Sequence, residues 1–493
     1  MADKYIDNTK NAGIPVGIQT TTEGCSCAVG TKIVAAAAGT PFSTCTAGDP
    51  FYVTDTDTYH SPGVYIIVSV NDDGASVTLN RDPVTANESV DTAHTPCDGT
   101  VPASEKDGAN GPYPTIQYAV HHAAAGSDVW IKANTGYTFD DLDQPATNSA
   151  GNPEGIIFSI SGSVSDNTHI NFIGYKTTPG DMDKGGAYYG GALDYYKKVN
   201  SLDAYMINPN AEWVGVDAND TLDDLLNITA LAIHNVHFRN IKFFSLTGSR
   251  VVLKITQTNY GWEFRNCVFD DTNEGSAVNG ALRAALFEDC AFGPTLGVAG
   301  TDYGLLDLTS AYGVSVVGCV FDVFGTNIAI GLYRCNQAIG NIIVNGGTSE
   351  AGVYVVSYGN VVCNNTIYNP AACIYLDGSN ATLVEYNNIL MPSNHSTGYG
   401  VRQIAGSLTY SDYSCCFSTD GNAMDSGRAW PTGFKGAYSI EVNPQLVGPA
   451  NGDFRPTLLN LGMPPVGLNG YSTIGAWQRK QGRSKAIQFM RTG

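Results

Sequence analysis

A six-residue phrase recurs along the second half of the chain, and it constrains the fold more than any other feature. The phrase alternates apolar residues with small or polar ones, and its fourth position returns at intervals of 22 to 29 residues. A unit of that length cannot bury its own apolar face, so successive copies must stack on one another. The fourth position is occupied, in order, by Cys267, Cys290, Cys319, Asn341, Asn365 and Asn387.

The pattern inside each phrase indicates a short β-strand. Alternation over about six positions is typical of a strand with one buried face, and no helical period separates the phrases. The sequence therefore predicts a parallel β-solenoid, in which equivalent positions of successive coils lie about 4.8 Å apart. The six fourth positions would then form one internal column, a structural ladder in which stacked Asn amides bond to their neighbours.

Residues at the two ends of this region resemble a known family. The stretches Thr115–Val120 and Gly126–Ile131, and later Ile474–Trp477, are similar to the start and finish of right-handed parallel β-helix proteins of the pectate-lyase-like superfamily. The resemblance implies an all-β fold, a right-handed parallel β-helix preceded by a small antiparallel β domain. It also implies a helix over 115–125 that caps the stack. It implies no single activity, because this superfamily includes lyases, hydrolases, epimerases, viral spikes and non-enzymatic coats.

The chain divides into five predicted regions. They are an N-terminal arm at 1–30, a small β-barrel or sandwich docking domain at 31–90, a linker at 91–114, the β-helix at 115–477 and a basic tail at 478–493. An irregular stretch at 177–230 is predicted to be an insertion between coils. An arm, a small β domain and a long β-helix resemble the layout of phage virion proteins, in which the N-terminal part docks on the particle.

Charge and composition narrow the partners and the location. The formal charge of −20 disfavours nucleic acid as a direct partner. The first 25 residues have no apolar run typical of a secretion signal, and no segment is long enough to span a bilayer. The twelve cysteines fit synthesis in a reducing cytoplasm. We therefore expect a virion protein made in the host cytoplasm, with no cofactor.

Paired tyrosines in the insertion and basic residues in the tail are the predicted subunit contacts. Tyrosine serves interfaces well, and a basic tail can reach an acidic neighbour. The alternatives are stacking of the tyrosines on sugar rings and a solvated tail. The predicted interface residues of the expected homotrimer are Tyr188, Tyr189, Tyr195, Tyr196, Arg479, Lys480 and Arg483.

The enzyme hypothesis depends on carboxylates. Asp270 and Asp322 hold the same place in their phrases two coils apart, or about 10 Å, which is near the separation that glycoside hydrolysis needs. With Asp289 they are the catalytic candidates, and Asp270 with Asp271 is the calcium candidate. The favoured alternative is structural. On that interpretation we expect Arg265 and Glu288 to form an ion pair across neighbouring coils, and Asp270 and Asp271 to turn the chain after a strand.

Two functions remain from this reading. The favoured one is a structural virion protein, namely a capsid decoration, fibre or tail component, which self-assembles and docks on a viral capsid or tail protein. The alternative is a tailspike-like polysaccharide lyase or glycoside hydrolase that acts on surface glycans along the β-helix groove. A cellular surface or filament protein is a weaker third hypothesis.

Overall fold

The computed structural model is nearly all β-strand and consists of two compact units. Within the part of the chain that it describes, no helix is long and apolar enough to cross a membrane. The described residues are 4–6, 25–27, 30–36, 39–40, 42–43, 45, 50–53, 63–79, 88–90, 116, 119, 125–133, 137–138, 146–147, 153–154, 156–157, 162, 168–202, 208–217, 224–228, 233–244, 251–270, 278–296, 305–324, 328–345 and 351–457.

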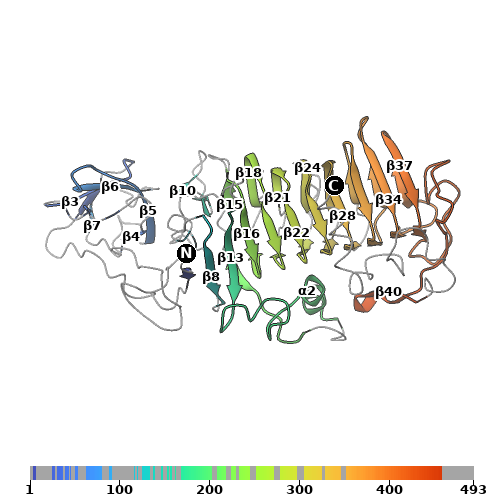
Figure 1. Ribbon diagram of the computed structural model, residues 1–493, viewed down its shortest axis with the longest axis horizontal. Coiled ribbons are helices and arrows are strands. Elements are labelled where there is room, and N and C mark those ends of the chain that lie inside the picture. Colours follow the sequence, from blue (N-terminus) through green and yellow to red (C-terminus); the bar gives the residue numbers. More distant parts are fainter. Residues whose placement is uncertain are drawn as a thin grey trace. The chain divides into compact units, whose positions relative to one another are not determined.

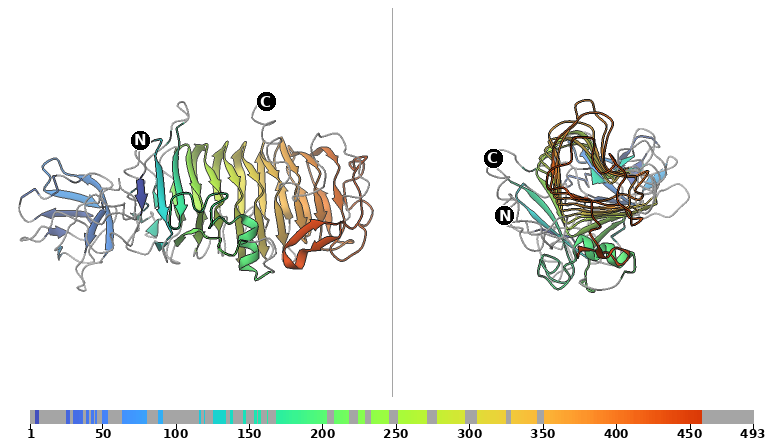
Figure 2. Two further views of the ribbon diagram at one scale, coloured as in Figure 1. Left: turned by 60° about the horizontal axis from the view of Figure 1, so that its bottom comes forward. Right: turned by 90° about the vertical axis from the view of Figure 1, so that its right-hand side faces the viewer.

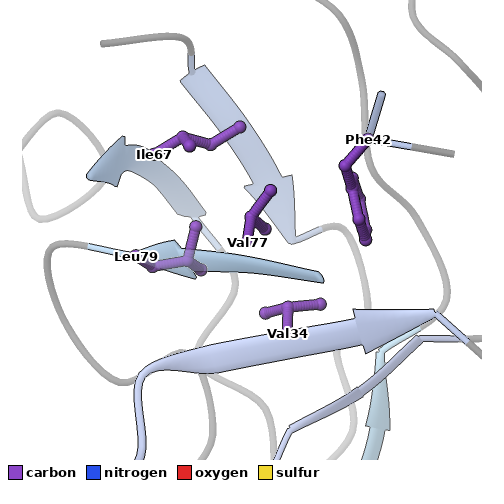
Figure 3. Packing of buried hydrophobic residues seen from close by; sticks show 5 residues of the cluster. All are labelled: Val34, Phe42, Ile67, Val77 and Leu79. Atoms are coloured by element: carbon purple, nitrogen blue, oxygen red, sulfur yellow. The ribbon is translucent and has the colours of Figure 1, made fainter. Parts of the chain in front are cut away.

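The first unit contains a small antiparallel sheet with the strand order β4-β5-β6-β3-β2-β7. Its strands are β2 (Cys25–Cys27), β3 (Ile33–Ala36), β4 (Pro50–Val53), β5 (Gly63–Val70), β6 (Ser76–Leu79) and β7 (Glu88–Val90). Alternate residues of β6 are buried, as expected for a sheet with one face on a core. Figure 3 shows that core, which contains Val34, Phe42, Ile67, Val77 and Leu79. The predicted antiparallel β domain is therefore confirmed, and it begins with β2 inside the predicted arm.

The first unit also contains parallel coils. Its strands include β1 (Lys4–Ile6), β8 (Asp128–Lys132), β9 (Tyr137–Thr138), β12 (Ile156–Ile157), β13 (Ile170–Tyr175), β14 (Val214–Asp217), β15 (Asp224–Ile228), β16 (Val236–Arg239) and β17 (Ile241–Phe244), with an antiparallel pair of β10 (Ala146–Thr147) and β11 (Pro153–Glu154). Strand β1 pairs in parallel with β8, so the first residues of the predicted arm belong to the solenoid. Strand β14 pairs with β9 and β17, and β15 pairs with β12.

These pairings correct one predicted boundary. Strands β14 and β15 lie inside the predicted insertion at 177–230 yet belong to coils. The segment that leaves the stack, which we call the excursion, therefore ends before β14. Ile116 and Ala119 of the predicted cap helix are helical and buried. The linker at 91–114 and the basic tail at 478–493 lie outside the described residues.

The second unit is a stack of coils in which three parallel sheets surround a core (Figures 1 and 2). The β19 sheet contains β19 (Glu263–Arg265), β22 (Leu286–Glu288), β25 (Ser315–Val317), β28 (Gln337–Ile339), β31 (Asn360–Cys363), β34 (Thr382–Tyr386) and β37 (Ser407–Asp412). The β20 sheet contains β20 (Val268–Phe269), β23 (Ala291–Leu296), β26 (Val320–Phe324), β29 (Ile342–Asn345), β32 (Thr366–Tyr368), β35 (Ile389–Met391) and β38 (Cys415–Cys416). The β21 sheet contains β18 (Val251–Tyr260, with 251 and 255–260 in this unit), β21 (Val278–Arg283), β24 (Leu306–Tyr312), β27 (Ile330–Arg334), β30 (Ala351–Val355), β33 (Ala372–Leu376) and β36 (Tyr399–Gln403). The predicted parallel β-solenoid is therefore confirmed.

A tight turn joins each strand of the β19 sheet to its successor in the β20 sheet, and its two residues have different roles. The first has a left-handed backbone, which Gly and Asn adopt at the lowest cost. It is Asn266 (φ 52°), Asp289 (φ 59°), Gly318 (φ 59°), Gly340 (φ 66°), Asn364 (φ 59°), Asn387 (φ 59°) or Tyr413 (φ 57°). The second residue forms the internal column, which therefore contains Cys267, Cys290, Cys319, Asn341, Asn365, Asn388 and Ser414.

The structure thus corrects one member of the predicted ladder. Asn388, and not Asn387, lies in the column: Asn365 Nδ2 donates to Asn388 Oδ1 at 3.0 Å. One coil earlier, Asn341 Nδ2 donates to Asn365 Oδ1, also at 3.0 Å. Asn387 holds the left-handed position instead, and its Nδ2 donates to Asn364 Oδ1 in the coil before it. The two consecutive Asn residues made the sequence register ambiguous by one position.

Two further elements of the second unit lie outside the coils (Figure 1). The helix α2 (Ala192–Val199) belongs to the excursion and packs on β23 and β26. Its Asp194 accepts the Gly191 N–H at 2.7 Å, and Lys197 and Lys198 lie in its last turn, so charges at both ends favour the helix dipole. Near the end of the described chain, β39 (Leu446–Gly448) and β40 (Asp453–Pro456) form a hairpin around η1 (Pro449–Asn451).

Candidate functional site

The two predicted catalytic acids lie under helix α2. The register that aligns Phe269, Phe292 and Phe321 places Asp270 and Asp322 at equivalent positions two coils apart. Tyr195 Oη donates a hydrogen bond to Asp270 Oδ2. Asn200 Nδ2 donates to Asp322 Oδ2 at 3.0 Å. Both carboxylates therefore anchor the excursion to the β20 sheet.

Burial beneath the helix changes the acid–base properties of this contact. Burial raises the pKa of Asp322, although the hydrogen bond from Asn200 acts in the opposite direction. Burial, together with the nearby Asp322, also raises the pKa of Tyr196. The space between α2 and the sheet is lined by side chains of the helix and by Phe292, Gly293 and Val320. Helix and coil thus pack closely beside Asp322.

The remaining acids of the predicted cluster have structural roles or are not described. Asp289 holds a left-handed turn position, and its N–H donates to Val317 O at 3.1 Å. Arg265 forms an ion pair with Glu288 on the next coil, which confirms the predicted ion pair. Asp271, of the calcium candidate, lies outside the described residues. Among the described residues, no group of three His, Cys, Asp or Glu side chains is placed to hold a metal ion.

The predicted interface tyrosines of α2 turn inward. Tyr195 and Tyr196 are only 5% and 8% exposed, so their predicted role between subunits is wrong because their rings already pack within one chain. The ring of Tyr196 lies 6.3 Å from that of Phe454 in β40, and Phe454 lies 5.8 Å from Tyr368. The helix therefore links the coils to the terminal hairpin.

The other predicted interface residues are less constrained. Tyr188 and Tyr189 are half-buried, and the Tyr189 carbonyl accepts a hydrogen bond from Asn208 Nδ2 at 2.8 Å. Arg479, Lys480 and Arg483 lie outside the described residues. The interface role of these five residues remains a prediction.

A surface feature that the sequence reasoning missed follows the edge of the β21 sheet. Five residues occupy equivalent positions on five successive coils. The backbone shows the equivalence: the residue that follows each of the first four donates its N–H to the carbonyl of the corresponding residue on the next coil, and the N···O distance is 3.0 Å in all four bonds. We call them the outer Tyr–Arg row: Tyr260, Arg283, Tyr312, Arg334 and Tyr358. Tyrosine and arginine alternate along the row.

Contacts along this row are cation–π contacts. The Arg283 guanidinium lies 5.5 Å from the centre of the Tyr260 ring, and its Nη1 donates to Tyr260 Oη at 2.9 Å. The Arg334 guanidinium lies 5.2 Å from the ring of Tyr358. Tyr312 and Tyr358 are nevertheless 48% and 43% exposed. The row is thus ordered by its own contacts while much of it faces solvent.

A second aromatic group lies on later coils of the same sheet. The ring of Tyr354 lies 5.3 Å from that of Tyr375, and Arg402 lies over Tyr375 at 4.9 Å and over Tyr399 at 5.4 Å. Arg428 covers Tyr399 at 4.7 Å. We call these five residues the aromatic cluster. Counting coil positions past each strand of the β21 sheet would have revealed both features, but the repeated phrase drew attention to the other two sheets.

Comparisons with known proteins assign neither a family nor an activity to the chain. No known family model matches the sequence, and no curated protein matches it. Three similar solved structures are lyases of alginate or pectate. An alginate lyase of the PL6 family, AlyGC, has a TM-score of 0.29 and 11% identity over 73% of this chain. The pectate lyase Pel9A has a TM-score of 0.32 and 14% identity over 74% of this chain and 91% of its own. An alginate lyase from Paenibacillus sp. str. FPU-7 has a TM-score of 0.25 and 15% identity over 61% of this chain and 95% of its own.

These likenesses are too distant to assign an activity. The chain spans 56% of the length of AlyGC, and all three identities and TM-scores are low. The pairing of the strands establishes the architecture directly. The chain is a parallel β-solenoid combined with a small antiparallel sheet.

Proposed function

We propose that this protein is a structural component of a viral particle and that self-assembly, rather than catalysis, is its main activity. The observation that carries the proposal is the engagement of the two candidate acids by α2. Carboxylates that hold a packed helix are poorly placed to protonate or attack a sugar, since glycoside hydrolysis needs both beside an open substrate site.

The order of elements along the chain also supports the proposal. A small antiparallel sheet precedes a long solenoid, which provides one part that can dock and another that can project. Its partners would be further copies of the chain, as a homotrimer, and a viral capsid or tail protein bound through the N-terminal region. The internal column gives such a rod its stiffness, because every coil is tied to the next.

An activity assay separates this proposal from the enzyme alternative. Wild-type protein and the variants Asp270→Ala and Asp322→Ala would be incubated with a panel of bacterial polysaccharides and of alginate and pectate, and new reducing or unsaturated ends would be measured. The proposal predicts no release above background for all three proteins. Robust cleavage by the wild type that either variant abolishes would overturn it.

Two measurements test assembly and location. Light scattering should give a particle of three times the 52.1 kDa chain mass. Antibodies against the later coils of the solenoid, which the proposal leaves projecting, should label intact viral particles purified from the source of the gene. A monomer at all concentrations would contradict the assembly, and unlabelled particles would contradict the location.

The aromatic cluster favours one additional role, contact with a surface glycan. The tyrosine hydroxyls and guanidinium groups of this half-buried cluster can bind sugar hydroxyls by hydrogen bonds. Titration of the wild type and of Tyr375→Ala with glycans that are not cleaved would test this role. Equal affinities of the two proteins for every glycan would show that the cluster does not bind glycans.

A further inference from the structure

We propose that the outer Tyr–Arg row is a subunit interface, at which each chain docks against an acidic surface of a second copy of itself. The inference rests on the proposed self-assembly and deepens it by naming the surface that carries it. The row replaces the buried tyrosines of α2 as the aromatic part of the interface.

The chemistry of the row determines what can bind there. Successive coils lie about 4.8 Å apart, so the contact of Arg283 with the Tyr260 ring runs along the stack. The same holds for Arg334 and Tyr358. Guanidinium groups thereby occupy a face of the Tyr260 and Tyr358 rings, which leaves these two rings poorly available for a sugar ring. What the row offers is N–H and O–H groups, since arginine has donors only and the phenol has one.

A surface rich in donors and positive charge needs an acceptor-rich, negative partner. A second copy of this chain fits locally, because its 46 Asp and Glu residues outnumber its 26 Lys and Arg residues and so provide acidic side chains that can face the arginines of the row. Its outward positions also repeat at the coil interval, so two parallel solenoids can match over several coils. Tyrosine and arginine are, in addition, the residues that most often dominate binding energy at protein interfaces.

Symmetry decides the kind of contact. The expected homotrimer has a threefold axis, about which a surface does not face its own copy as it does across a twofold axis. The contact is therefore heterologous, with the row of one chain on a different surface of the next. A heterologous contact that closes on itself forms a ring, and the proposed trimer is such a ring.

Charge reversal in the row tests the inference. The double variant Arg283→Glu/Arg334→Glu would be compared with the wild type by light scattering over a dilution series. We expect the variant to be monomeric at concentrations where the wild type is trimeric, with the dissociation concentration raised at least tenfold. The matched control Lys184→Glu/Lys435→Glu makes the same change of charge at two other exposed positions and should remain trimeric.

The variant Arg334→Lys keeps the charge but loses the planar group that stacks on Tyr358, so a smaller rise in dissociation concentration is expected. Circular dichroism would verify that each variant is folded. If the double variant is unfolded, Arg334→Lys and Arg334→Gln carry the test alone.

The outcomes distinguish the inference from the function on which it rests. A trimeric wild type with an equally trimeric folded variant would overturn the inference and leave self-assembly standing. A wild type that is monomeric at every concentration would overturn both. A wild-type trimer that dissociates when polygalacturonate is added, with the polymer bound through Arg283 and Arg334, would assign the row to an anionic glycan and overturn the inference.

Discussion

The earlier and later coils of the second unit solve the same packing problem with different side chains. In the earlier coils the internal column consists of thiols, and the core beside it contains stacked phenylalanines. Phe269 and Phe292 lie 4.8 Å apart at 4°, and Phe292 and Phe321 lie 4.5 Å apart at 2°. In the later coils the column consists of amides, and aliphatic residues such as Ile343 and Ile367 continue the phenylalanine stack.

The column residues of both halves donate to the same row of backbone carbonyl oxygens. In the earlier coils thiols donate to it: Cys290 Sγ lies 3.3 Å from Phe264 O. In the later coils amides donate to it, and Asn365 Nδ2 lies 2.9 Å from Ala338 O. The amide also bonds to the next amide in the column, whereas a thiol is a weak donor. The earlier half thus depends mainly on apolar packing and the later half on a hydrogen-bonded ladder.

The largest effect is expected from Asn365→Leu, which removes the centre of the amide ladder. The change leaves the Asn341 N–H and Nδ2 without their acceptor and Ala338 O without its donor. Each of these three buried groups costs about 1–3 kcal/mol when left unpaired, so the free energy of unfolding should fall by at least about 3 kcal/mol. Chemical denaturation measures it, and unchanged stability would remove the ladder from this account.

A nearly equal loss is expected from Phe292→Ala in the earlier half. Phe292 is 2% exposed and stacks between two other rings. Removing a buried phenylalanine leaves a cavity and costs about 3–5 kcal/mol. A loss below 1 kcal/mol in the same denaturation experiment would show that the earlier coils do not depend on this stack.

A smaller effect is expected from Cys290→Ala. The thiol is fully buried, and burial raises its pKa, so it stays protonated and acts as a small apolar group with a weak donor. Its removal should cost about 1–2 kcal/mol, because the cavity is small. A cost equal to that of Asn365→Leu would mean that the two halves of the column are not different in kind.

The subtlest test uses pH at the end of the amide ladder. Glu385 is fully buried and accepts hydrogen bonds from Asn388 at 2.8 Å, from Ser411 at 2.7 Å and from Ser414. Burial raises its pKa above the ordinary 4.5, although these bonds act in the opposite direction. A raised carboxyl pKa contributes stability below the ordinary value that is lost as pH rises through the folded-state value.

We therefore expect the stability difference between wild type and Glu385→Gln to shift in favour of the variant as pH rises from about 4. Parallel denaturation series from acid to neutral pH measure it. Curves that stay a constant distance apart would show that the pKa of Glu385 is the same in the folded and unfolded chains.

The sequence was sufficient for the fold because a period of strand-length phrases leaves few architectures open. It was insufficient for the register at the Asn387–Asn388 pair, where either residue fits the pattern and only the backbone distinguishes them. It also missed the partners of Asp270 and Asp322, because Tyr195 of α2 and Asn200, which caps that helix, are far away in the chain. A surface tyrosine and a buried one look alike in sequence, and for that reason Tyr195 was assigned outward and the outer Tyr–Arg row was overlooked.

The second residue of each tight turn holds the coils together from inside. Comparing the thermal and chemical stability of Asn388→Leu with that of Asn387→Leu tests it most directly. Asn388→Leu should cost at least about 3 kcal/mol, since Asn365 N–H and Nδ2 lose their acceptor and Val362 O its donor. Asn387→Leu should cost only about 1–2 kcal/mol, mainly from the left-handed backbone. The reverse order, or equal losses, would contradict the claim.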